Sequence, residues 1–238
     1  ALGQWQLRRL DWKTDLIARV ERQLAAAPSP LPSPEQWTTL TRERDEYRRV
    51  RVEGEFDFSR DTLVAATTDL GGGYWVLTPM RLPDPRSPGA TLWVLVNRGF
   101  VPPELRASVP HGEARQQVTG LLRLTEPAGG LLRKNEPAAG RWYSRDVAAI
   151  AAARGLQGPV APFFLDAQAE PAPPGAAPSG SPRAGLTVLA FTNNHWAYAL
   201  TWFALAAIML AAVGYLLVDD RRQRRAGASL GDHPSHTS

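Results

Sequence analysis

The N-terminal segment has an amphipathic pattern with a helical period. Five apolar residues recur at intervals that place them on one face of a helix: Leu7, Leu10, Ile17, Val20 and Leu24. Most of the positions between them are charged or small. Because residues three and four apart share a helix face, the pattern predicts an amphipathic helix over residues 1–27 that ends at Pro28.

The middle of the chain changes to the short apolar runs that are typical of β-strands. We expect strands over residues 47–56, 62–67, 71–82, 91–101, 116–124, 161–168 and 185–192. Residues 144–156 instead predict a short helix, with Ser144 as its N-cap and Gly155 at its end. Turns rich in Gly and Pro separate the strands. The pattern therefore indicates an α+β fold with an antiparallel, β-rich domain, curled toward a small, partly closed barrel.

Two segments within this region are poor in large apolar residues. "PSPLPSPEQW" begins a stiff, proline-rich connector over residues 28–44. "AEPAPPGAAPSGSPRAG" predicts a mobile loop over residues 168–185, because so few of its side chains can pack into a core. The strand expected after this loop must rejoin the same sheet, so we expect one domain over residues 45–192.

An uninterrupted apolar run follows this domain. No charged residue occurs from Trp196 to Val218, and about 20 apolar residues in a helix suffice to cross the bilayer core. The run therefore predicts a transmembrane helix over residues 193–218. Four arginines stand just beyond it: Arg221, Arg222, Arg224 and Arg225. By the positive-inside rule, residues 219–238 are a cytoplasmic tail and the β-rich domain is extracytoplasmic.

Composition narrows the range of functions. The chain has 27 basic and 23 acidic residues, a net charge of +4 that is too mild and too dispersed to indicate nucleic-acid binding. It has no cysteine, which excludes disulfides, thiolate metal sites and thiol redox chemistry. The sequence starts at Ala1 and carries no signal peptide, so we expect a removed leader or an N-terminal transmembrane helix before residue 1.

Motifs for catalysis are weak. "GGGY" at 71–74 lacks the Lys-Ser/Thr pair and the following helix of a phosphate-binding loop, so a hairpin turn is the favoured interpretation. No G-x-S-x-G motif occurs. The carboxylates Glu53, Asp57, Glu126 and Asp146 are scattered, with no spacing that pairs them. These observations argue against an enzyme.

The number and positions of the histidines limit which metal sites the chain can form. They are His111, His195, His233 and His236, and the expected topology leaves at most the first two in one compartment. Such a chain cannot assemble the ligand cluster of a copper chaperone. A single histidine can still be an axial haem ligand, because the porphyrin supplies four of the iron's ligands.

His195 stands at the entrance of the apolar run and has two interpretations. It is either an interfacial histidine beside a helix start capped by Asn193 and Asn194, or a residue that faces a cofactor or partner. Helical spacing puts His195, Tyr198 and Trp202 on one stripe, which suits close packing against another helix or a flat ring. The residues alone favour the first interpretation and leave the second open.

Seven segments, in order along the chain, carry a resemblance to a known family. They are "LGQWQLRRLDWK" (2–13), "GEF" (54–56), "GYWVLTP" (73–79), "VLVNRGFVP" (94–102), "GLLRLTEP" (120–127), "NEPAAGRWYSRD" (135–146) and "NNHWAYALTWFALA" (193–206). Together they resemble the Surfeit locus protein 1 family, which are assembly factors for cytochrome c oxidase. The similarity covers nearly the whole chain except the connector, the loop and the tail.

The resemblance implies two transmembrane helices that flank the extracytoplasmic domain, the first ending at about Ala1. It implies a role without enzymatic turnover, in maturing subunit I of a haem–copper oxidase, with haem a as the cofactor. The implied partners are oxidase subunit I, other respiratory-complex subunits and the lipid bilayer. The implied location is the bacterial plasma membrane or the mitochondrial inner membrane.

Carried onto this chain, the resemblance makes His195 the candidate haem-iron ligand, with Tyr198 and Trp202 flanking the ring. Arg98, in "VNRG", becomes a candidate partner of a haem propionate, although a surface arginine at a strand end fits its position equally well. Two other roles stay open. One is a scaffold that grips a folding oxidase subunit without touching haem, and the other is a stable accessory subunit of the finished oxidase.

Overall fold

The computed structural model describes residues 20–127, 133–169, 182–185, 201 and 203–216. The chain divides into two compact units. One unit spans Arg19–Leu189 and contains all the strands among the described residues, and the other comprises Ala1–Ala18 and Ala190–Ser238.

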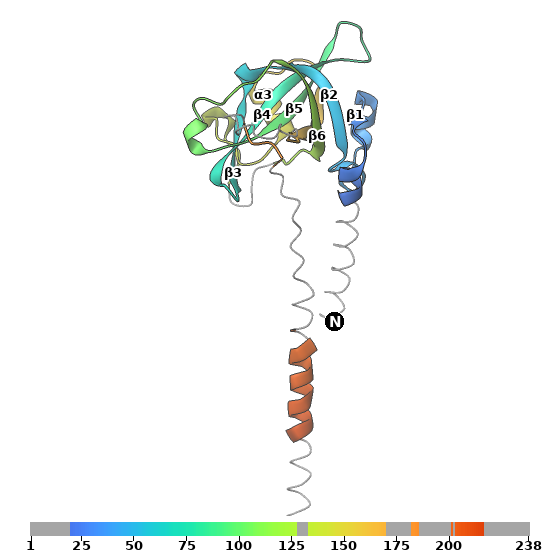
Figure 1. The fold of residues 1–238 in the computed structure, drawn as a ribbon, viewed down its shortest axis with the longest axis vertical. Coiled ribbons are helices and arrows are strands. Elements are labelled where there is room, and N and C mark those ends of the chain that lie inside the picture. Colours follow the sequence, from blue (N-terminus) through green and yellow to red (C-terminus); the bar gives the residue numbers. More distant parts are fainter. Residues whose placement is uncertain (1–19, 128–132, 170–181, 186–200, 202, 217–238) are drawn as a thin grey trace, which may run out of the picture. The chain divides into compact units, whose positions relative to one another are not determined.

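The Arg19–Leu189 unit is built from β-strands with a few short helices (Figure 1). The strands are β1 (Ser29–Pro30), β2 (Arg49–Phe56), β3 (Thr62–Thr68), β4 (Gly71–Pro83), β5 (Thr91–Val101), β6 (Arg115–Leu124) and β7 (Val160–Ala167). The α-helical segments described in this unit are residues 20–25, α2 (Arg42–Asp45) and α3 (Val147–Ala153), and the 3-10 turns are η1 (Pro34–Thr39), η2 (Phe58–Arg60), η3 (Pro103–Leu105) and η4 (Pro137–Ala139). The predicted β-rich domain with short helices is confirmed.

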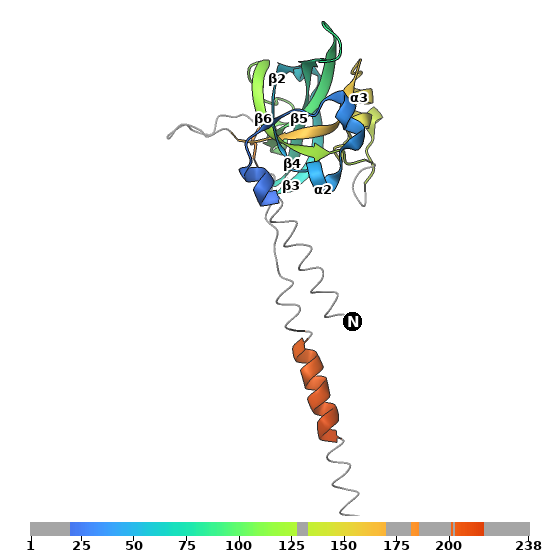
Figure 2. The ribbon, with the colours of Figure 1, turned by 90° about the vertical axis from the view of Figure 1, so that its right-hand side faces the viewer.

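The described strands include five that close into a barrel (Figures 1 and 2). They follow one another in the order β2, β6, β7, β5 and β4, and β4 pairs again with β2. The closing seam between β2 and β4 is short, because it pairs Glu55 with Arg81 and Phe56 with Met80. The barrel is thus fully closed, where the sequence predicted partial closure.

A glycine permits the close approach at this seam. A Cβ atom on Gly54 would lie 2.5 Å from Cδ2 of Leu82 and 2.6 Å from the backbone oxygen of Arg81. Any side chain at this position would therefore push β2 and β4 apart.

The expectation of a wholly antiparallel sheet is wrong at two places. β5 and β7 run parallel, and so do β1 and β2. β7 lies between β5 and β6, and it is antiparallel to β6. Since β5 and β6 run in opposite directions, a strand between them can be antiparallel to one neighbour only.

Strand β5 is apolar on both faces because both of its faces are covered. From Leu92 to Asn97 every residue of β5 is buried. One hydrophobic cluster includes Met80, Val94 and Phe163, and the other joins Leu95 and Phe164 to residues of α3 and Trp142. A strand buried on both sides reads as a continuous apolar run rather than as an alternating pattern.

The proline-rich segment 28–44 packs on the barrel. It forms β1, η1 and the start of α2, and its Leu31, Trp37 and Leu40 pack against the first cluster. The Trp37 ring meets the Phe163 ring edge-on at 6.3 Å, and its Nε1 donates to the Pro32 carbonyl. The segment therefore contributes to the core as well as connecting two elements.

Helix α3 begins two residues later than predicted. Its N-cap is Asp146, whose carboxylate accepts from the Ala149 N–H, and Ser144 instead accepts a hydrogen bond from Asn135. Ser144 as N-cap was therefore wrong. Gly155 follows the helix at φ +63°, a left-handed conformation that suits glycine, and this part of the prediction is confirmed.

Several predicted segments lie partly outside the described residues. Of the loop over 168–185, residues 170–181 are outside, whereas Arg183 exchanges two backbone hydrogen bonds with Phe100. Residues 203–216 of the expected transmembrane segment are helical and exposed. Among the described residues, no helix has both the length and the apolar character needed to cross a bilayer.

Candidate functional site

The predicted haem-binding residues are only partly within the described structure. His195, Tyr198 and Trp202 lie outside the described residues, so their role stays a prediction. Arg98 is described, on β5. Within the described residues, no group of three or more His, Cys, Asp or Glu side chains could hold a metal ion.

Arg98 is buried, and its donors are engaged by the protein itself. Its side chain is 9% exposed, and its Nη2 lies 2.9 Å from an Asp61 carboxylate oxygen. Its Nε donates to the Thr78 hydroxyl at 2.7 Å and its Nη1 to the Pro110 carbonyl at 2.9 Å. Burial lowers the pKa of Arg98, and the charge of Asp61 opposes that effect. The Arg98 side chain is thus largely buried, and its charge is already paired with Asp61, so a propionate would compete with this carboxylate.

His111 belongs to the same cluster. Its ring stacks on the Phe58 ring at 4.6 Å, and its Nε2 lies 3.4 Å from the Asp61 carboxylate. The guanidinium of Arg98 lies 4.9 Å from the centroid of the Phe58 ring. These contacts tie the loop that contains Pro110 and His111 to the barrel, so the cluster is a structural anchor.

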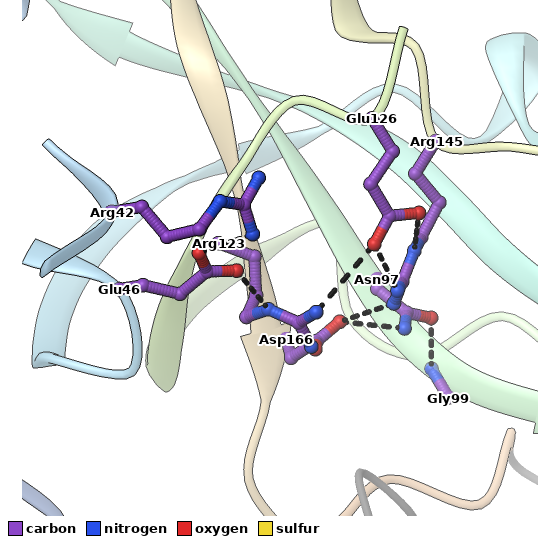
Figure 3. A network of polar contacts seen from close by, with 8 residues as sticks. All are labelled: Arg42, Glu46, Asn97, Gly99, Arg123, Glu126, Arg145 and Asp166. Atoms are coloured by element: carbon purple, nitrogen blue, oxygen red, sulfur yellow. Dashed lines mark hydrogen bonds and ion pairs between the residues drawn. The ribbon is translucent and has the colours of Figure 1, made fainter. Parts of the chain in front are cut away.

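A second set of polar side chains forms a buried charge network (Figure 3). Its members are Arg42, Glu46, Asn97, Arg123, Glu126, Arg145 and Asp166. They come from α2 and the residue after it, from β5, β6 and β7, and from the segments after β6 and before α3. The network therefore ties together segments that are distant in sequence.

Asp166 lies at the centre of the buried charge network and is 2% exposed. One of its oxygens accepts from Asn97 Nδ2 at 2.8 Å, and the other lies 2.9 Å from Arg123 Nη1. Arg145 Nη1 approaches the first oxygen at 3.4 Å. Asn97 in turn accepts the N–H of Gly99, whose φ of +130° favours glycine. Two arginines and an amide thus compensate the charge of one buried carboxylate.

Arg123 spans the buried charge network. Its Nε donates to Glu46 at 3.0 Å, and its guanidinium lies 4.8 Å from the centroid of the Tyr47 ring. Burial, the largest single effect, lowers the pKa of Arg123, but Asp166, Tyr47 and Glu46 together outweigh burial, so this pKa lies above its ordinary value. Arg123 stays charged because its carboxylate partners are buried with it.

Glu126 completes the buried charge network at its outer side. It receives two hydrogen bonds from Arg145, at 3.0 and 2.6 Å. Burial alone would raise the pKa of Glu126, but the hydrogen bond and charge of Arg145, with the charge of Arg123, lower it below its ordinary value. Glu126 is therefore ionised, and each carboxylate of the network is paired with an arginine, so the network holds segments of the fold together rather than receiving a ligand.

Sequence reasoning missed this network. Glu126 was placed among scattered carboxylates, and its partner Arg145 is 19 residues away along the chain. One local signal did exist, because Arg123 interrupts the apolar run "GLLRL" and a charge within a buried strand needs a partner. The network also gathers residues from three segments that carry the family resemblance, "VLVNRGFVP", "GLLRLTEP" and "NEPAAGRWYSRD".

Comparison with known proteins places these features in context. The SURF1 family model matches residues 1–207. The chain is 35% identical to Surfeit locus protein 1 of Rattus norvegicus over 230 residues, covering 87% of this chain and 68% of that protein. It is 34% identical to the Homo sapiens protein of the same name over 228 residues, covering 87% and 69%. It is 36% identical to a SURF1-like protein of Monosiga brevicollis over 228 residues, covering 88% and 80%.

Proposed function

Because the chain belongs to the SURF1 family, we propose that it acts in the assembly of a haem–copper (cytochrome c) oxidase, assisting haem a insertion into subunit I or stabilising that subunit. The observation that carries the proposal is the extent of the match. It includes the barrel and also residues 193–206, the segment that contains His195. An assembly role involves no enzymatic turnover, and the charge pairing inside the barrel suits such a role.

In this proposal the two units of the chain have different roles. In the barrel, charged residues of the resembling segments pair within the protein, as Arg145 does with Glu126, and these pairs hold the fold together. In this proposal, haem binding depends on His195 with Tyr198 and Trp202. The partners in this proposal are oxidase subunit I, other respiratory-complex subunits and the lipid bilayer, in the bacterial plasma membrane or its mitochondrial equivalent.

The test is an absorption spectrum of the full chain purified from cells that make haem a. We expect a haem spectrum in the parent protein and its loss or marked shift in His195→Gln. A glutamine can still form the hydrogen bonds of a helix cap, but it lacks the imidazole lone pair that ligates iron. Oxidase activity in the same cells should fall together with the spectrum.

His111→Gln is the matched control, because His111 is the one histidine among the described residues and lies against Asp61 and Phe58. This variant should keep the spectrum. An unchanged spectrum in His195→Gln, with haem still bound stoichiometrically, would contradict the ligand role of His195.

A scaffold that binds the oxidase subunit without haem is the second candidate. The engagement of Arg98 by Asp61, Thr78 and Pro110 favours it, because the charge of this guanidinium is already compensated within the protein. Absence of haem from the parent protein, together with a loss of oxidase when the chain is deleted, would support the scaffold. Co-purification with mature, active oxidase would instead support a stable accessory subunit.

A further inference from the structure

A small pocket on the barrel surface concentrates arginine and tyrosine side chains. Its lining comes from β3, β4, the turn after η3 and the segment before α3, namely Leu63, Ala65, Tyr74, Arg106, Arg133, Gly140, Arg141, Trp142 and Tyr143. This arginine–tyrosine pocket has a volume of about 180 Å³. It contains no acidic residue in its lining and does not share a residue with the buried charge network.

Two of its arginines have aromatic partners and no carboxylate partner among the described residues. The guanidinium of Arg106 lies 5.2 Å from the centroid of the Tyr74 ring, and that of Arg133 lies 5.4 Å from the centroid of Tyr143. The third, Arg141, pairs with Glu136. Both Arg106 and Arg133 are exposed. The pocket therefore carries an excess of positive charge that the described protein does not neutralise.

A larger groove on the barrel has no such excess of positive charge. Glu53, Glu55, Arg81 and Arg115 line that groove of about 620 Å³. Arg81 pairs with Glu55 at 2.7 Å and Arg115 with Glu53 at 3.1 Å. Its charges are matched within the protein, so the groove offers an incoming anion little that is not already paired.

Trp142, which lines the arginine–tyrosine pocket, is held in place by contacts within the protein. Trp142 is 2% exposed, and its carbonyl accepts the Ala65 N–H at 2.8 Å. Val64 and Trp142 form an isolated parallel bridge, which holds the segment before α3 against β3. Because Tyr143 adjoins Trp142 and Tyr74 lies on β4, the rings under both free guanidinium groups belong to ordered elements.

The chemistry of the pocket suits a carboxylate carried on a polypeptide. A guanidinium that stacks on a ring keeps its N–H edge available, and this edge matches the two oxygens of a carboxylate. Arginine and tyrosine are also the residue types that are enriched in protein–protein interfaces. The volume is below the about 300 Å³ of typical cofactor sites, so it fits a side chain better than a whole small molecule.

We propose that the arginine–tyrosine pocket binds acidic side chains of a protein partner, with Arg106 and Arg133 as the two anchors. This binding role does not depend on haem chemistry or on His195. A phosphate group from a lipid or from solution is the competing ligand, and the experiment below separates the two.

The test uses the purified full chain and isothermal titration calorimetry with a hexapeptide of alternating Glu and Ala. The matched peptide carries Gln in place of Glu. Arg106→Gln and Arg133→Gln are measured singly and together, and Arg51→Gln, an exposed arginine on β2 outside this pocket, is the control. Inorganic phosphate and vesicles containing phosphatidylglycerol are titrated in parallel.

We expect binding of the Glu peptide and not of the Gln peptide. The double variant should weaken that binding by about tenfold or more, because it removes two charge-assisted contacts, whereas Arg51→Gln should leave it unchanged. Unchanged thermal unfolding of the variants confirms that they are folded. Three results would overturn the proposal: no binding of the Glu peptide, an equal loss in Arg51→Gln, or arginine-dependent binding of phosphate or vesicles that is tighter than that of the peptide.

Discussion

Two groups of arginines in the same barrel have similar ring partners and opposite surroundings. Arg123, in the buried charge network, lies 4.8 Å from the Tyr47 ring, and Arg106, in the arginine–tyrosine pocket, lies 5.2 Å from the Tyr74 ring. Arg123 also has three carboxylate partners, Glu46, Glu126 and Asp166, whereas no described carboxylate pairs with Arg106. The ring contact is common to both. The carboxylates therefore determine which arginine is held by partners within the protein and which is available to bind another molecule.

Burial explains why the two groups differ in their expected energetics. A buried charge that loses its partner is left in a poorly solvating environment, whereas an exposed guanidinium is solvated by water whatever lies beside it. Removing one member of the buried charge network should therefore affect the whole fold. Removing an arginine from the pocket should affect only what binds there.

The largest expected effect is that of Asp166→Ala. This change leaves Arg123 and Arg145 without their shared buried carboxylate, and we expect a loss of about 3–5 kcal/mol in the free energy of unfolding. Urea denaturation measures it. Arg81→Ala is the matched control, since Arg81 and Glu55 form an exposed pair that is worth about 0–1 kcal/mol. Equal losses in the two variants would remove the distinction between buried and exposed pairs.

A smaller, pH-dependent effect is expected for Glu126→Gln. The pKa of Glu126 is lowered in the folded protein, so its ionised form contributes stability above the unfolded-state pKa of about 4.3. That contribution, about 1–2 kcal/mol, is lost as the pH falls from this value through the lower folded-state pKa.

Urea midpoints of the parent and of Glu126→Gln, measured from about pH 7 down to about pH 3, test this expectation. The two midpoints should differ at neutral pH and converge in acid. A difference that does not change with pH would show that the Glu126 carboxylate contributes no charge-dependent stability to the buried charge network.

The smallest effect on stability is expected for the pocket. Arg106→Gln and Arg133→Gln, singly or together, should change the free energy of unfolding by no more than about 0.5 kcal/mol, because both side chains are exposed. The same urea titration checks this. A loss comparable to that of Asp166→Ala would mean that the pocket arginines also hold the fold together, contrary to the comparison above.

The strands of the barrel could be predicted because their pattern is local. The expected strand over 91–101 coincides with β5, and the expected strand over 71–82 differs from β4 by one residue. Pairing could not be predicted in the same way. The parallel contact between β5 and β7 joins Val96 to Leu165, and no local pattern records such a distant neighbour.

For the candidate site too, the sequence identified a residue but not the distant residues that surround it. Arg98 was singled out by its position in a resembling segment, but its burial depends on Asp61, Thr78 and Pro110, which come from three other parts of the chain. The packing of the connector could not be predicted for a related reason. Proline content predicts stiffness, but it does not show that Trp37 has an aromatic partner in Phe163.

The short seam between β2 and β4 has a consequence for solubility. A closed ring leaves no unpaired strand edge within the barrel, and unpaired edges are the places where chains join one another into aggregates. In this barrel the closure consists of the pairs Glu55–Arg81 and Phe56–Met80, beside Gly54. A side chain at position 54 would open the ring there and expose two edges. Gly54 therefore helps to keep these two edges paired, although it contributes no side chain to the core.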